Sequence, residues 1–361
     1  MTFCIEPNFV ERCLEEPTLL CSLDDIQWQD LFRILRYNDL VATLASTIAI
    51  YGVPIESDYA QKHLISARTY SNRQSQQVIN EAHNLTSLLD EIKIYPTFLK
   101  GAAYSIAKDK NAQGRLMSDV DILVTKAYLP DIEMKLKEHG WHEKEVSDYD
   151  DNYYRKWSHE LPPYYHHESG TTLDIHHTLI PPITGKRVPI EHILDSAEVH
   201  EGLYILPLEW RLLHCIIHFF YNEDYDKPFR DFWDIKCLID LAFNEKKLEN
   251  VLEIAKQYGF KSELVYCLLL LELKYERPYS RQLNGLLSIN LKEKLFVRYV
   301  LSHCVVLRHR LTDTIQTKVC AFIMFIRGHL KKMPLKILIP HAGIKSYRGV
   351  VSLLLGKHHF D

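Results

Sequence analysis

The chain has 361 residues, of which 47% are hydrophobic and 25% are charged, and its formal net charge is −4. These values are typical of a globular protein with two or three compact units, and they argue against a globally basic nucleic-acid-binding protein. The 13 glycines and 15 prolines are too few for a collagen-like or linker-rich chain.

Membrane spans and secretion signals are not expected from the sequence. No apolar run approaches the ~18 residues that a membrane span needs, and the N-terminus lacks a basic start followed by an apolar stretch. The eight cysteines include no CxxC pair. We therefore expect reduced thiols in the core of a cytoplasmic protein.

The first 92 residues carry a helical pattern. Apolar residues recur at helical spacing over 24–53, which Pro54 ends, and 57–92 run without proline or glycine. This predicts a helix over 24–53, followed by one long helix or two closely joined helices over 57–92.

The period of the pattern then changes. Short strands are predicted at 94–99, 115–125 and 171–179, with helices over 102–112 and 129–139 between them and a polar, aromatic-rich loop over 141–170. Strand–helix–strand–helix–strand in this order predicts one small α/β unit.

Helical patterns dominate again from residue 190. The predicted helices are 209–220, 229–243, 246–258, 261–273, 292–304 and 314–330. We therefore expect an α+β fold with four parts: an N-terminal helical segment (1–92), a small mixed-sheet core (93–185), a C-terminal helical domain (186–313) and a basic helical tail (314–361).

Two carboxylates occupy alternate positions of the strand predicted at 115–125. Asp119 and Asp121 therefore point to one face, while Val120 and Ile122 point into the core. Two carboxylates held side by side repel each other, so a divalent cation is the usual reason to keep them together. Mg²⁺ prefers oxygen ligands, commonly one or two carboxylates with substrate phosphates. The alternative is a solvated strand edge.

A third carboxylate follows on the strand at 171–179. Leu173 and Ile175 face one way, whereas Asp174 and His176 face the other. If the two strands pair, Asp174 joins a cluster that could hold two metal ions, which clamp the attacking and leaving oxygens of a phosphoryl transfer. The third acid could also take the proton from an acceptor hydroxyl.

The step Lys100-Gly101 lies at a strand end before a helix. Glycine lets a phosphate approach the backbone, and the helix N-terminus favours its charge. Lys100 and Arg115 are candidate phosphate contacts. The alternatives are a surface role for Lys100 and a structural ion pair between Arg115 and Asp119.

These segments resemble a known family. FLKGAAY, RLMSDVDILV and LDIHHTL, followed by LLHCIIHFF and FRDFWDIKCLI, are similar to the uncharacterised nucleotidyltransferase family of the DNA polymerase beta-like superfamily. The resemblance covers about residues 25–245. It implies a small mixed-sheet nucleotidyltransferase core flanked by helices, and it suggests bacterial biosynthetic clusters as a context.

The resemblance also implies an activity. A nucleoside monophosphate would pass from an NTP such as ATP to an acceptor, with Mg²⁺ or Mn²⁺ and release of pyrophosphate. Asp119 and Asp121 match the metal-binding pair, Asp174 the third acid and Gly101 the phosphate-loop glycine. The acceptor stays open between a sugar phosphate, a small metabolite, a peptide, a protein and an RNA end, although the net charge argues against nucleic acid.

Ala102 keeps a second hypothesis open. The wider superfamily usually has Ser after the loop glycine, and that hydroxyl for a phosphate is absent here. A non-catalytic nucleotide-binding sensor or scaffold on the same fold is therefore the alternative.

The histidines suggest a third hypothesis, a His-based metal hydrolase. His166-His167 and His176-His177 lie in two strands that we expect to pair, but adjacent positions face opposite ways, so at most one histidine of each pair could converge on a zinc ion.

Two further histidines are spaced as zinc ligands on a helix can be. His214 and His218 are four residues apart, but the segment between them lacks the glutamate of HExxH. We expect His218, with Arg230 and Asp234, to line a cleft between the core and the C-terminal helices, with a buried polar network as the alternative. His176, His218 and Arg230 are accordingly further candidates for nucleotide binding.

Charge is uneven at the C-terminal end. From residue 314 to 361 there are eight lysines and arginines and one acid. The favoured interpretation is a solvated helix face with an ordinary apolar side. The alternatives are peripheral contact of 314–339 with an anionic membrane surface and binding to nucleic-acid phosphates.

Overall fold

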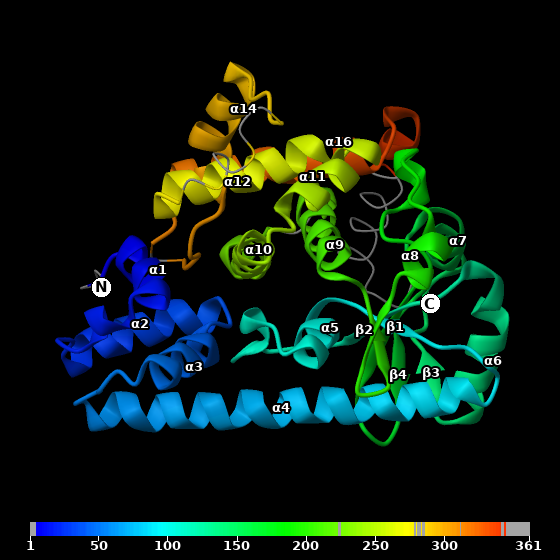
Figure 1. The fold of residues 1–361 in the computed structure, drawn as a ribbon, viewed down its shortest axis with the longest axis horizontal. Coiled ribbons are helices and arrows are strands. Elements are labelled where there is room, and N and C mark those ends of the chain that lie inside the picture. Colours follow the sequence, from blue (N-terminus) through cyan, green and yellow to red (C-terminus); the bar gives the residue numbers. More distant parts are fainter. Residues whose placement is uncertain are drawn as a thin grey trace, which may run out of the picture.

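The computed structural model describes residues 5–222, 225–277, 279, 283, 286–310, 312–340 and 343. A seven-stranded mixed sheet lies among helices that precede and follow it in the chain. The predicted α+β fold with flanking helices is therefore confirmed (Figure 1).

The N-terminal helices are α1 (Pro7–Glu15), η1 (Pro17–Leu20), α2 (Asp25–Tyr37) and α3 (Val41–Tyr51). The prediction of one helix over 24–53 is wrong, because the chain breaks after α2. The Asn38 side chain donates to the carbonyl of Ile34 at 2.7 Å, and Asp39 has φ of 56°. Asparagine and aspartate tolerate such left-handed backbone, so this dipeptide can end a helix.

Helix α4 (Asp58–Asp90) is one unbroken helix of 33 residues. The Ser57 side chain accepts a hydrogen bond from the backbone of Ala60 and caps its start. At 1.5 Å per residue the helix is about 50 Å long. It runs beneath the whole molecule, from the N-terminal helices to the sheet (Figure 1).

The sheet has the order β3-β4-β5-β2-β1-β7-β6. Its strands are β1 (Thr97–Phe98), β2 (Val120–Leu123), β3 (Trp141–Glu143), β4 (Tyr164–His166), β5 (Thr172–His176), β6 (Glu198–His200) and β7 (Leu203–Ile205). Central β2 pairs with β5 in parallel and with β1 in antiparallel orientation. The loop predicted over 141–170 is thus wrong, because it contains β3, β4 and a helix, and the hairpin β6–β7 was not predicted.

Helices from α5 onward surround the sheet and build the C-terminal half. They are α5 (Lys100–Ala107), η2 (Lys110–Ala112), η3 (Lys126–Tyr128), α6 (Leu129–Glu138), α7 (Asp148–Trp157), η4 (Pro182–Thr184), α8 (Ile190–Asp195), α9 (Leu208–Tyr221), α10 (Pro228–Asn244), α11 (Leu248–Gln257), α12 (Lys261–Tyr275), α14 (Leu291–Phe296), the π-helix η5 (Val297–Leu301), α15 (Ser302–Cys304) and α16 (Ile315–Lys332).

Buried apolar side chains form two clusters. The smaller one joins the sheet to α5, α6 and the second half of α4. The larger one joins the N-terminal helices to α9–α12 and α16. Polar contacts bind the same two ends of the chain, because Lys274 donates to Glu11 at 2.7 Å and Asn38 donates to the carbonyl of Arg308 at 2.8 Å. The two helical segments therefore share one core.

Helix α16 buries Cys320 and Met324 in the larger core and exposes other apolar residues. Arg327 and Lys331 both pair with Glu263, which is 1% exposed, whereas Phe322 and Leu330 are 62% and 51% exposed. Lys318 and Lys336 are exposed, as the favoured interpretation of a solvated charged face expects. Arg327 and Lys331 differ, because they turn toward the buried carboxylate of Glu263. No helix in the described ranges is long and apolar enough to cross a membrane. Residues 344–361 of the predicted tail lie outside the described residues.

Most of the described cysteines lie in the core, as expected. Cys13, Cys237, Cys267, Cys304 and Cys320 are buried and free. Cys215 is half-buried and Cys21 is exposed, so the expectation of core thiols is wrong for Cys21.

Gly114 provides a test of how the N-terminal helices are joined to the segment before β2. Its φ is +75°, and an added Cβ would lie 2.2 Å from the carbonyl oxygen of Ala42 on α3. We expect Gly114→Ala to lower the free energy of unfolding by roughly 3 kcal/mol or more, because backbone must shift.

Gly52 is the matched control for that substitution. Its φ is +62°, but an added Cβ meets no atom of the described residues within 4 Å. Gly52→Ala should cost only the ~1–2 kcal/mol of left-handed backbone. Equal losses for both variants in denaturant unfolding would contradict the close approach of α3.

Candidate functional site

Strands β2 and β5 bring two of the predicted carboxylates together. They pair in parallel with Asp121 opposite Asp174, and neighbouring strands lie about 4.8 Å apart. Val120 and Ile122 on the other face are 1% and 0% exposed and belong to the sheet core. The predicted alternation therefore places the acids on the face away from that core.

Asp121 is the most enclosed of the acids, at 2% exposure. Its Oδ1 accepts from Lys100 Nζ at 2.6 Å and lies 2.9 Å from His176 Nε2. Burial by itself would raise the pKa of Asp121, but the charge of Lys100 and the bond to His176 outweigh it and hold that pKa below its usual range. Asp121 is therefore a stable carboxylate at neutral pH.

The carboxylates of Asp174 and Asp119 have fewer favourable contacts than that of Asp121 to offset their burial. Asp174 Oδ1 is buried and has no hydrogen-bond partner among the described residues. Burial, followed by the charges of Asp121, Glu160 and Asp119, raises the pKa of Asp174 to about 7. Burial and the charge of Asp121 also raise the pKa of Asp119. The carboxylates on this face therefore repel one another more strongly than the neighbouring cations offset.

A cleft of about 170 Å³ opens beside these acids between the sheet and the C-terminal helices. Seven of the predicted site residues line it: Lys100, Gly101, Arg115, Asp119, Asp121, His218 and Arg230. Asp234 also lines it. His218, Arg230 and Asp234 therefore lie in the cleft between the core and the C-terminal helices, as predicted. Asp174 and His176 lie on β5, next to Asp121, and are not part of the lining.

Two arginines join the segment before β2 to α10. Arg115 Nε donates to Asp234 Oδ2 on α10 at 2.9 Å, and Arg230 Nη2 on α10 donates to the carbonyl of Leu116 at 2.6 Å. Arg115 pairs with Asp234 rather than with Asp119, so the alternative pairing is wrong. Both guanidinium groups still border the cleft and carry positive charge into it.

Gly101 allows Arg115 to lie where it does. A Cβ at this position would be 2.5 Å from Arg115 Nη1 and 2.8 Å from Met117 Cγ. The glycine thus has a packing role beside the phosphate role that was predicted for it. The preceding residue, Lys100, has φ of 43°, a left-handed conformation that costs energy in a non-glycine residue and often marks functional sites.

A second group of side chains lies behind Asp121. Glu160 Oε2 is 3.4 Å from both His159 Nε2 and His176 Nε2. Within the described residues, these three make up the one group of His, Cys, Asp or Glu whose ligand atoms all lie within 4.8 Å of one another. Asp119, Asp121 and Asp174 do not form such a group, and their role as metal ligands stays a prediction.

Sequence reasoning missed His159 and Glu160. They follow α7 in the segment taken for a loop, and an antiparallel bridge between Glu160 and His176 brings them to β5. His166, by contrast, lies at the opposite end of the β4–β5 pair, so the two adjacent histidine pairs do not meet. A bridge of this kind has no local pattern that could have revealed it.

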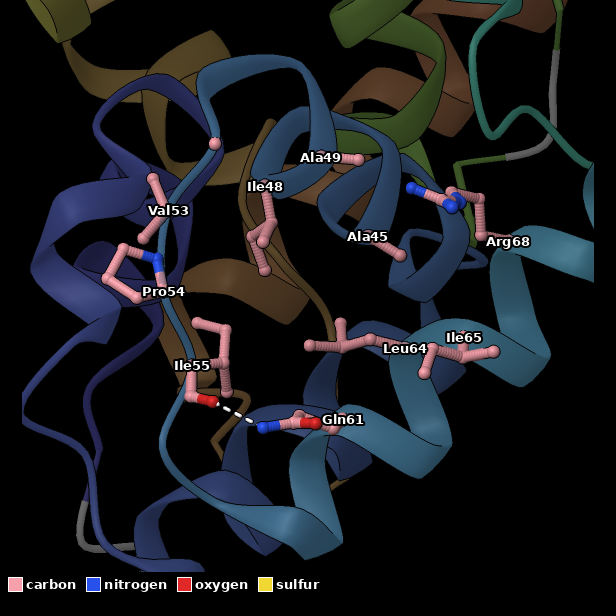
Figure 2. Close-up of a pocket in the computed structure, with 11 residues that line it drawn as sticks. Ala45, Ile48, Ala49, Val53, Pro54, Ile55, Gln61, Leu64, Ile65 and Arg68 are labelled. Atoms are coloured by element: carbon pink, nitrogen blue, oxygen red, sulfur yellow. Dashed lines mark hydrogen bonds between the residues drawn. The ribbon is translucent and has the colours of Figure 1, made fainter.

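A larger apolar pocket lies elsewhere, between α3 and α4 (Figure 2). Its volume is about 430 Å³. Ile48, Leu64 and Ile65 point into it, and Arg68 lies at one side. An apolar lining with one arginine supplies little of the charge that a triphosphate needs, so the small polar cleft is the candidate for chemistry.

Comparison with known proteins identifies a family. Residues 24–276, more than two thirds of the chain, match the family described as uncharacterised nucleotidyltransferase. No curated protein and no solved structure matches the chain. The match includes β2 and β5, the segment before β2 that carries Arg115 and Asp119, and helix α10, which carries Arg230. The chain therefore belongs to the uncharacterised nucleotidyltransferase family.

Proposed function

We propose that the protein transfers a nucleoside monophosphate from an NTP to an acceptor hydroxyl, with Mg²⁺ as the cofactor and pyrophosphate as the leaving group. One observation supports the proposal in addition to the family match. The carboxylates of Asp119, Asp121 and Asp174 lie beside the cleft. Lys100, Arg115 and Arg230 are among the other residues that line it. Acids for a metal and cations for phosphates adjoin one another there.

Two observations on this face support a divalent cation there. Asp174 Oδ1 is buried without a partner in the described part of the chain, and the pKa of Asp119 is raised by burial and by Asp121. An added positive charge would relieve both conditions. Asp119 and Asp121 would hold the ion, with Asp174 as the third acid, and Mn²⁺ suits the same oxygen ligands. The bound ion supplies neutralisation of charge on the triphosphate and on the departing pyrophosphate.

The chain's own groups orient the substrates. Lys100, at the first turn of α5, and the Arg115 and Arg230 guanidinium groups are positioned to contact phosphate oxygens, which guanidinium recognises well. Asp174 can take the proton from the acceptor hydroxyl. Positioning and electrostatic stabilisation carry most of such a reaction. The acceptor is left open between sugar phosphates, small metabolites, peptides and proteins.

A nucleotide-binding sensor is the second candidate. Lys100 already neutralises Asp121 at 2.6 Å, and Ala102 supplies no hydroxyl to a phosphate. Both features favour binding over turnover. An NTP that stabilises the protein without being consumed, with any tested acceptor, would select this candidate.

Substitution of Asp119 tests the metal assignment. We expect Asp119→Asn to abolish the Mg²⁺-dependent part of NTP stabilisation in thermal unfolding, which for the wild type is about 2.7 kcal/mol at ~100 times Kd. Turnover should fall more than ~100-fold, the scale of one strong transition-state contact.

Asp131→Asn is the matched control. Asp131 lies exposed in the first turn of α6, and its loss should leave both measurements unchanged. Near-normal turnover in Asp119→Asn would show that the metal lies elsewhere.

Gly101→Ala tests the cleft's cationic side. The added Cβ would displace the Arg115 guanidinium and Met117. Because a charge-assisted contact contributes ~1.5–3 kcal/mol, we expect NTP binding to weaken by roughly tenfold to a hundredfold. Calorimetric titration with the NTP measures this directly.

Gly202→Ala is the control for glycine replacement. Gly202 has φ of +85° in the turn between β6 and β7, and an added Cβ would meet nothing within 4 Å in the part of the chain that the structure describes. This variant should lose some stability and keep its NTP affinity. Unchanged affinity in Gly101→Ala would remove Arg115 from the phosphate site.

A further inference from the structure

We propose that His159, Glu160 and His176 form a binding site for a divalent transition metal, separate from the Mg²⁺ ligands and next to them. The proposal does not rest on nucleotidyl transfer. It concerns His159 and Glu160, for which that reaction has no use, together with His176, which also contacts Asp121, and it names a metal of different chemistry.

The spacing of the donor atoms matches a metal site. Glu160 Oε2 is 3.4 Å from His159 Nε2 and 3.4 Å from His176 Nε2. In a tetrahedral site with bonds of ~2.0–2.1 Å, neighbouring donor atoms are about 3.3–3.4 Å apart. The two nitrogens also lie within 4.8 Å of each other. The three atoms thus surround a point at bonding distance with little rearrangement.

Backbone hydrogen bonds hold these donors in place. His177 N donates to the carbonyl of His159 at 2.9 Å, and Leu161 N donates to that of Ile175 at 3.0 Å. Glu160 forms a bridge with His176 between these two bonds. The donors therefore stand on a short extension of the sheet rather than on free loops, which is the rigidity that a metal site requires.

The burial of these three side chains supports a binding role for them. The side chains of His176, His159 and Glu160 are 0%, 17% and 24% exposed. Enclosing two imidazoles and a carboxylate costs free energy unless they are well compensated. Metal ligation through His176 Nε2 requires the ring proton on Nδ1, which has no hydrogen-bond partner among the described residues, and it replaces the present contact of Nε2 with Asp121.

The donor set selects the metal. Two imidazole nitrogens and one carboxylate oxygen suit Zn²⁺ and its neighbours in the first transition row, whereas Mg²⁺ demands oxygen. Asp121 Oδ1, 2.9 Å from His176 Nε2, is the nearest further oxygen. Sharing it would couple this site to the nucleotide cleft.

The test measures metal binding by the full chain after removal of any histidine tag. Zn²⁺ alone is titrated by calorimetry and bound zinc is counted by mass spectrometry, and Co²⁺ alone is followed by its visible absorption. We expect a single Zn²⁺ site with Kd of roughly 1 µM or tighter. His159→Gln and Glu160→Gln should each weaken it by ~100-fold or more.

Two controls identify the site. His167→Gln changes an exposed histidine in the other pair and should leave the titration unchanged. Asp119→Asn should lose Mg²⁺-dependent NTP stabilisation but keep the Zn²⁺ site, which separates this proposal from the proposed function. If His159→Gln does not fold, as judged by circular dichroism, Glu160→Gln carries the test.

Three results would overturn the proposal. They are the lack of any tight Zn²⁺ site in the wild type, a tight site that both His159→Gln and Glu160→Gln retain, and a tight site that Asp119→Asn removes. The last two would assign the zinc to surface histidines or to the carboxylates.

Discussion

The buried carboxylate of Asp121 is the constraint on which the site depends. A charged group this enclosed is tolerated only when it is paired and hydrogen-bonded. Its partners come from two elements, Lys100 from the start of α5 and His176 from the end of β5. Losing one partner of such a buried pair typically costs ~3–5 kcal/mol. The carboxylate therefore fixes the helix and the strand relative to β2 at the same time.

The charged residues of the cleft come from two parts of the fold, the sheet and helix α10. The acids stand on the sheet, whereas Arg230 stands on α10 and Arg115 is held there by Asp234. Neither unit alone contains a complete site. The position of α10 depends in turn on the larger core, which the N-terminal helices share. Segments far from the cleft thus set the separation of its opposite walls.

Local sequence patterns were enough to predict part of this arrangement. The rest depends on contacts between residues far apart in the sequence, which no local pattern reveals. Alternation along the strand predicted at 115–125 led to the expectation that Asp119 and Asp121 share a face, and both line the cleft, although Asp119 lies one residue before β2. The apolar residues of β5 made Asp174 a reasonable neighbour. Nothing local indicated that Arg115 would meet Asp234, 119 positions away, or that a bridge would bring Glu160 to β5. The strands in 141–170 were missed because a tyrosine-rich polar stretch shows neither helical nor alternating periodicity.

The shared core has a consequence for how the protein is made. Glu11 and Lys274 are 263 positions apart, and Asn38 and Arg308 are 270 apart. At ~5–20 residues per second of synthesis, the first helices leave the ribosome on the order of ten to fifty seconds before the surface that covers them. During that interval the apolar faces of α2 and α3 stand exposed on a nascent chain. Chaperone demand should therefore concentrate on the earliest part of the polypeptide.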